Sequence, residues 1–163
     1  MQLFHHSLCP HSRFVRLVLG EYGIACELTE EPVWKRRPEF LALNPAGTTP
    51  VLMENGLAVP GAMVIAEYLD EKHGAGQGDR RLLPPDPVGR IEVRRLTSWF
   101  HDKFFAEVTE HLVQEKITKR HLPESEGGGP PDSAAIRAAR SNIRYHLRYI
   151  GWLAKARNWL AGD

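Results

Sequence analysis

The spacing of hydrophobic residues changes character along this chain. In the first part, short apolar runs typical of strands alternate with segments of helical periodicity, which predicts the order β-α-β-α-β-β-α over about the first 75 residues. Asn55-Gly56, between two apolar runs, indicates a two-residue hairpin turn. Further along, no strand pattern appears, and long helical patterns cover residues 87–118 and the stretch from about Ser133. The pattern therefore predicts an α/β unit followed by an all-α unit.

A stretch rich in glycine and proline separates the two patterns. We expect a first domain over residues 1–76, a linker over 77–86 and a helical domain over 87–163. Asp86 followed by Pro87 is typical of a helix start, since aspartate caps helices and proline fits their first turn. The first helix is expected to bury Phe14, Val15, Leu17, Val18 and Leu19, and the last helix one face with Ile136, Ile143, Leu147, Ile150 and Ala154.

Composition and charge narrow the classes of partner. The chain is 42% hydrophobic and 25% charged, which is ordinary for a globular protein. A formal net charge of +1 gives no global electrostatic case for nucleic acid or an anionic membrane. The apolar runs fall short of the roughly 18 residues of a membrane span, and the N-terminus lacks a signal-peptide layout. Cys9 and Cys26 make no disulfide framework, so we expect a cytoplasmic protein without membrane insertion.

Four motifs carry a resemblance to a known family: CPHSRFVRLVL from Cys9, NPAGTTPVL around Pro50, VIAEYLDEKHG from Val64, and NWLAGD at the end of the chain. With them the chain resembles the glutathione transferase superfamily. The resemblance implies a thioredoxin-like βαβαββα domain followed by a helical domain, with a cis peptide bond before Pro50. Members of the superfamily continue past the last motif, so we expect the helical domain to be incomplete at Asp163.

Cys9 is a candidate nucleophile. It precedes Pro10 at the expected start of the first helix, and a helix N-terminus with nearby cations can lower a thiol pKa from about 8.5 to between about 3.5 and 7.5. The resemblance places Cys9 where the superfamily contacts the glutathione sulfur and where omega-class members carry a cysteine, with Thr49 and Pro50 as part of the glutathione site. The alternative is a small apolar residue without a chemical role. A redox sensor would need a second thiol, and Cys26 falls on the next expected strand.

The glutathione anchor of the superfamily is replaced in this chain. Where the resemblance implies a Glu-Ser or Gln-Ser pair opening the third helix, the chain has Gly61 and Ala62, preceded by Pro60. Losing two hydrogen bonds to charged groups, roughly 1.5–3 kcal/mol each, weakens binding by about 10²–10⁴-fold. We therefore expect no cofactor and no efficient catalysis. The alternative is a glutathione-dependent thiol transferase that uses Cys9.

Two further groups of residues have open interpretations. His5, His6, Cys9 and His11 are metal-ligand types, but neighbouring strand residues point to opposite faces, so we expect no metal site. Trp34 lies in a polar stretch and is either exposed, as a lid or partner contact, or packed beneath its loop.

The last helix carries a basic stripe. Arg137, Arg140, Arg144 and Arg148 are spaced by three or four residues, with Tyr145, Tyr149 and Trp152 nearby. The stripe is either a solvated face or a docking surface, since Arg and Tyr are enriched at interface hot spots. FVRLVLGEYG, the Pro-Gly-Ala replacement and much of the second half also resemble alphaproteobacterial transferase-like proteins that bind the division protein FtsZ. That resemblance implies a non-catalytic homodimer recruited to the division site, and the candidate docking residues are Trp34, Arg137, Arg140, Asn142 and Arg144.

Overall fold

The computed structural model describes residues 1–161 and divides into two compact units. The first unit ends at Leu83 and the second begins at Pro84, inside the stretch 77–86 expected to link them. Among the described residues, no helix combines the length and the apolar composition needed to cross a membrane.

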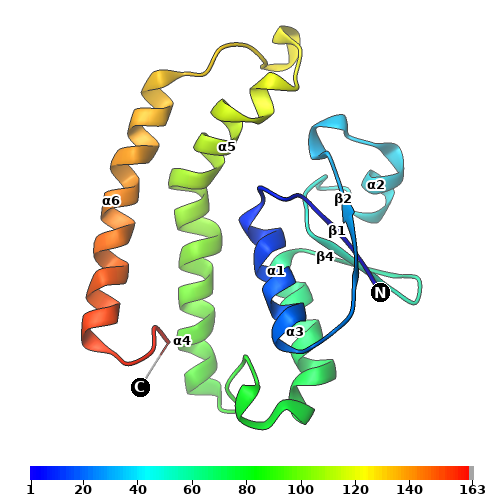
Figure 1. The fold of residues 1–163 in the computed structure, drawn as a ribbon, viewed down its shortest axis with the longest axis vertical. Helices are drawn as coiled ribbons and strands as arrows, with labels where there is room; N and C mark the ends of the chain where they lie inside the picture. The colour runs from blue at the N-terminus through cyan, green and yellow to red at the C-terminus, as the bar shows by residue number, and fades with distance from the viewer. Residues whose placement is uncertain (162–163) are drawn as a thin grey trace. The chain divides into compact units, whose positions relative to one another are not determined.

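The first unit contains a four-stranded mixed sheet in the order β2-β1-β3-β4. Its elements run along the chain as predicted: β1 (Gln2–His5), α1 (Pro10–Glu21), β2 (Glu27–Glu30), α2 (Pro38–Leu43), β3 (Val51–Glu54), β4 (Leu57–Pro60) and α3 (Ala62–His73). β1 pairs with β2 in parallel, with Leu3 opposite Leu28, and with β3 antiparallel, with Leu3 opposite Leu52. The thioredoxin-like order βαβαββα is confirmed, and α1 and α3 lie side by side (Figure 1).

The core of this unit lies between the sheet and the two neighbouring helices. Leu3 and Leu52 from the strands, Val15 from α1 and Ile65 from α3 are fully buried. The prediction for Leu17 was wrong, since its side chain is 57% exposed. At about 100° per residue, Val15, Val18 and Leu19 share one side of α1, and Leu17 falls on the opposite side.

A buried carboxylate binds the segment at the end of the first unit through hydrogen bonds. Asp70 of α3 is 2% exposed and accepts hydrogen bonds from the Tyr22 hydroxyl at 2.6 Å and from Arg81 Nη2 at 2.7 Å. It also accepts from Arg81 Nε at 3.1 Å and from the Leu83 N–H at 3.3 Å. Between Asp70 and Arg81, residues 74–80 form the 3₁₀ segment η2 (Gly74–Arg80), which is interrupted by a kink at Gly78. The chain leaving α3 is therefore held against its own unit up to Leu83.

The second unit pairs two long helical runs that lie antiparallel (Figure 1). The first run is continuous through α4 (Pro87–Ser98), the π-helical segment η3 (Trp99–Thr109) and α5 (Glu110–Lys116), and the second is α6 (Ser133–Ala156). Short 3₁₀ turns η4 (Thr118–Arg120) and η5 (Glu124–Glu126) lie between them. Asp86 caps α4 by accepting from the Gly89 N–H at 2.7 Å, as its position predicted.

The π-helical segment was not predicted. Trp99 and Phe100 are followed five residues later by Phe104 and Phe105, a spacing that suits the i→i+5 hydrogen bonding of a π-helix. Trp99 and Phe104 both pack against His146 of α6, with ring centroids 5.7 and 4.7 Å away. The wide helix thus brings two aromatic rings onto one residue of the neighbouring helix.

The inner face of α6 also differs from the predicted one. Ala139, His146 and Leu153 are buried at intervals of seven residues, whereas Leu147 is 57% exposed. The true inner face is turned by roughly 80° from the predicted one. The central residue of the observed inner face is His146. Because histidine is polar, hydropathy alone predicts that the neighbouring isoleucines are buried instead.

Candidate functional site

Cys9 lies where the sequence placed it, at the N-cap of α1. Its Sγ accepts a hydrogen bond from the Ser12 N–H at 3.4 Å and donates to the Thr49 carbonyl at 3.6 Å. The bond between Thr49 and Pro50 is cis. The junction of β1 with α1 and the loop before β3 therefore meet at one half-exposed thiol.

The environment of this thiol favours partial ionisation. Burial by itself raises the pKa of Cys9, but hydrogen bonds with His11, with Ser12 and with the side chain of Thr49 outweigh it and lower the pKa to about 7. At neutral pH the thiol and the thiolate forms of Cys9 are therefore present in comparable amounts, and the thiolate is the nucleophilic form. Cys9 therefore stays a candidate nucleophile.

The position of the glutathione anchor is occupied by backbone and apolar groups. Gly61 caps α3 at φ 91°, a conformation that suits glycine, and its N–H donates to the Pro50 carbonyl at 3.0 Å. Pro60 has no N–H to offer, and Ala62 is buried. Two of the three residues therefore have no backbone N–H left for a carboxylate.

The prediction that His5 and His6 point apart was wrong. β1 ends at His5, so the alternation of faces does not reach His6, and both rings approach Glu30. His5 Nε2 lies 3.5 Å and His6 Nε2 3.7 Å from the Glu30 carboxylate, which also accepts from the Ser7 N–H at 2.9 Å. Among the side chains that the structure describes, no group of three or more His, Cys, Asp or Glu is arranged to hold a metal ion.

Trp34 lies half-buried in the 3₁₀ turn η1 (Val33–Lys35) of the first unit. Its ring meets His6 edge to face, with centroids 5.3 Å apart and planes at 84°. The loop around it is closed by an ion pair between the fully buried Glu31 and Arg37, at 2.6 Å from Oε2 to Nη2. Trp34 is therefore half-buried, with its ring packed against that of His6.

The basic stripe is exposed on α6 in the second unit. Arg137, Arg140 and Arg144 line an open hollow of about 420 Å³ together with Ser141 and Ile143. Asn142 does not join them, because its side-chain amide donates to the Glu107 carbonyl of η3 at 3.0 Å. The structure thus brings three of the candidate docking residues together and places Asn142 in the helix–helix contact.

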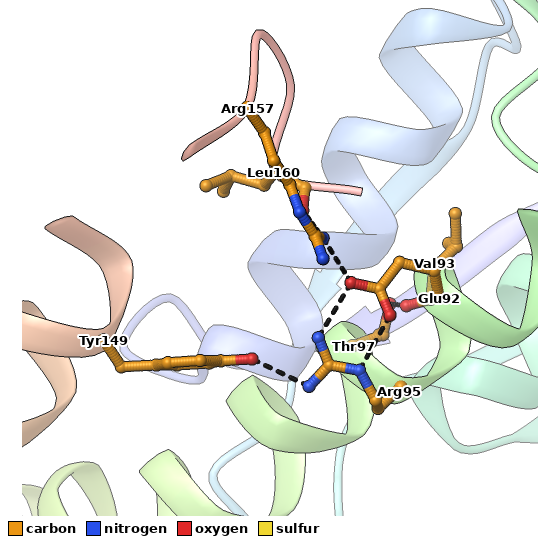
Figure 2. Close-up of polar contacts among 7 residues, drawn as sticks. All are labelled: Glu92, Val93, Arg95, Thr97, Tyr149, Arg157 and Leu160. Carbon is orange, nitrogen blue, oxygen red and sulfur yellow. Dashed lines mark hydrogen bonds and ion pairs between the residues drawn. The ribbon is translucent and has the colours of Figure 1, made fainter. Parts of the chain in front are cut away.

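Tyr149 of α6, and Arg157 just past the end of this helix, are joined to α4 by a hydrogen-bonded network that the sequence did not predict (Figure 2). Arg95 donates to both oxygens of Glu92 at 2.8 Å and to the Tyr149 hydroxyl at 2.7 Å, and Arg157 also donates to Glu92. Hydrogen bonds with Arg95 and Arg157 lower the pKa of Glu92 to about 2. The i,i+3 spacing of Glu92 and Arg95 was a usable signal, but nothing local points to Arg157.

Comparison with known proteins gives a consistent result. Residues 3–78 match the family described as "Glutathione S-transferase, N-terminal domain". The chain is 41% identical to "FtsZ-localized protein A" of Caulobacter vibrioides over 98% of its own length and 68% of that protein. This chain belongs to the glutathione S-transferase superfamily, in the family of FtsZ-localized protein A.

Solved structures of the superfamily share its fold. A glutathione S-transferase from Sinorhizobium meliloti superimposes with a TM-score of 0.95 at 53% identity, over 99% of this chain and 71% of that one. FzlA from C. crescentus superimposes with a TM-score of 0.86 at 39% identity, over 99% and 70% of the two chains. The chain thus spans about two thirds of the length of these relatives. Of the fourth motif, Gly162 and Asp163 lie outside the described residues.

Proposed function

We propose that this member of the glutathione S-transferase superfamily binds FtsZ and regulates bacterial cell division without catalysing a reaction. The observation that carries the proposal is the 41% identity to FtsZ-localized protein A across nearly the whole chain. In this role the protein is cytoplasmic and is recruited to the division site. A homodimer would present each docking surface twice to a filament, which raises avidity without new contacts.

The geometry of the superfamily's ligand site supports a non-catalytic role. Pro60, Gly61 and Ala62 offer no side-chain hydroxyl, acid or amide, and the Gly61 N–H is taken by Pro50. A chain that keeps the fold but lacks this anchor is best suited to binding through its surface. The candidate surfaces are the half-buried Trp34 in the first unit and the arginine stripe of α6 in the second.

Co-sedimentation with FtsZ filaments tests the proposal. We expect the full chain to pellet with filaments assembled from FtsZ of the same organism, and to stay in the supernatant with unassembled FtsZ. Trp34→Ala should reduce the pelleted fraction, while Leu57→Ala, an exposed control in the same unit, should not. Absence of the wild-type chain from the pellet at micromolar concentrations of both proteins would refute the proposal.

A second candidate function is supported by Cys9. A thiol with a pKa of about 7 at the N-cap of α1, beside the cis peptide bond of Pro50, has the chemistry of a glutathione-dependent thiol transferase. Calorimetric titration with glutathione distinguishes the two functions. Micromolar binding, together with deglutathionylating activity that Cys9→Ser abolishes, would favour the enzyme, whereas no binding at millimolar glutathione would exclude it.

A further inference from the structure

The positive charge of this chain is distributed unevenly. The whole sequence of 163 residues contains 21 lysines and arginines and 20 aspartates and glutamates. α6 alone carries four arginines and one lysine and has no aspartate or glutamate in its 24 residues. This helix therefore holds a local excess of positive charge, with Asp132 at its N-cap as the adjacent carboxylate.

Arg140 and Arg144 of the stripe lack the carboxylate partners that several other arginines of the described chain have. Arg37, Arg81 and Arg95 each pair with an acidic side chain at 2.6 to 2.8 Å. Within the described part of the chain, Arg140 and Arg144 make no such pair. Arg137 donates to the Ser133 hydroxyl at 3.1 Å, and its charge helps to lower the pKa of Asp132. The guanidinium groups of Arg140 and Arg144 therefore remain available to an external acceptor.

The stripe is also unfavourable for the helix that carries it. Arg137 and Arg140 are three residues apart, and Arg140 and Arg144 four, so neighbouring guanidinium groups repel each other along one face. Local conflicts of this kind are expected where a surface is used for recognition. A solvated face that serves only solubility would gain from mixed charges instead.

The hollow between these arginines is not purely polar. Ile143 contributes to its lining, and Leu147, 57% exposed, continues the apolar edge by one turn. Arginine can hold a carboxylate with two parallel hydrogen bonds, while the isoleucine offers a contact to an apolar side chain. Such a surface suits a ligand that combines fixed carboxylates with a hydrophobic residue.

We infer that the α6 stripe of Arg137, Arg140 and Arg144 binds an acidic protein segment, whose carboxylates pair with the arginines and whose apolar side chain enters the hollow against Ile143. The inference rests on the proposed function, since the segment would belong to FtsZ or to a protein assembled with it. A nucleic acid or a lipid surface fits less well, because neither supplies a side chain for the hollow and the chain as a whole carries a charge of only +1.

The test uses a fluorescein-labelled helical peptide in which two glutamates one turn apart flank a leucine. Its matched control has glutamine in place of glutamate. We expect anisotropy to show binding of the glutamate peptide to the full chain, weakening between about 0.1 and about 1 M salt as the Debye length falls from about 10 to about 3 Å. Arg140→Glu and Arg144→Glu should each weaken binding by roughly tenfold to hundredfold.

Lys155→Glu is the matched variant, since it makes the same charge reversal on the same helix outside the hollow. An equal loss of affinity in Lys155→Glu would overturn the inference in favour of diffuse attraction. Equal binding of the glutamine peptide would also overturn it, as would tighter binding of phosphatidylglycerol vesicles or of a single-stranded DNA oligonucleotide.

Parallel co-sedimentation with FtsZ filaments separates the two claims. If the wild-type chain binds the glutamate peptide through the stripe but does not pellet with FtsZ, the proposed function fails and the inference stands. If the chain pellets with FtsZ while Arg140→Glu and Arg144→Glu pellet equally well, FtsZ binding stands and the inference is wrong.

Discussion

The buried carboxylate of Asp70 should contribute a large share of the stability of the first unit. Replacing it in Asp70→Asn keeps the shape of the side chain, and its remaining oxygen can still accept from the Tyr22 hydroxyl and the Leu83 N–H. The amide NH₂, however, would face Arg81, which now donates twice to Oδ2 at 2.7 and 3.1 Å. The variant thus loses two charge-assisted hydrogen bonds.

The expected magnitude follows from the burial of the two partners. Hydrogen bonds to charged groups contribute roughly 1.5–3 kcal/mol each. The Arg81 side chain is 24% exposed and can turn toward water, which recovers part of the loss. We therefore expect Asp70→Asn to lower the free energy of unfolding by about 3 kcal/mol, toward the lower end of what breaking a buried pair costs.

Urea denaturation followed by circular dichroism measures this change, with Tyr22→Phe as a milder variant that removes one hydroxyl from the same network. The pH dependence gives a second readout. Burial raises the pKa of Asp70, but Arg81, Tyr22 and Leu83 outweigh it, so the folded pKa is lowered. The difference in free energy of unfolding between wild type and Asp70→Asn should then have its full value above the ordinary aspartate pKa of about 3.9. It should disappear as the pH falls through the lowered pKa of the folded state. A difference below about 1 kcal/mol at neutral pH, or one that persists in strong acid, would refute the reasoning.

Three further predictions concern other parts of the first unit. The rate of alkylation of Cys9 by iodoacetamide should rise with pH through a midpoint of about 7. Ser12→Ala removes the hydroxyl but keeps the N–H that donates to Cys9, so it should move that midpoint upward only by the hydroxyl's share; an unchanged midpoint would contradict a contribution of the Ser12 hydroxyl to the lowered pKa. Glu31→Gln should lower the free energy of unfolding and raise the quenching of Trp34 by acrylamide relative to wild type, because the buried Glu31 loses its ion pair with the partly exposed Arg37. Gly74→Ala should destabilise the unit in thermal melts, since its Cβ would lie 2.9 Å from Asp70 Oδ1, whereas Gly20→Ala, with nothing within 4 Å, should not.

The sequence determined the local features of this protein. Proline after Cys9, aspartate before Pro87 and the Asn55-Gly56 pair each act through backbone geometry within a few residues, so the starts of α1 and α4 and the β3–β4 hairpin were predictable. Side-chain type and spacing were sufficient for the arginine stripe, because residues three or four apart share a helix face in any fold. The replacement of the glutathione anchor by Pro60, Gly61 and Ala62 could likewise be recognised from the sequence, because the flanking motifs resemble those of the superfamily.

Only the tertiary structure decided which polar groups meet. Asp70 and Tyr22 are 48 residues apart, Glu92 and Arg157 are 65 apart, and Asn142 reaches Glu107 across 35 residues. No periodicity within one element encodes such pairs, because they depend on how elements pack. The same limit explains why a buried histidine, His146, was not recognised at the centre of α6. Hydropathy scores a residue by its own polarity, whereas burial depends on the rings of Trp99 and Phe104 and the Glu107 carboxylate that the fold brings to it.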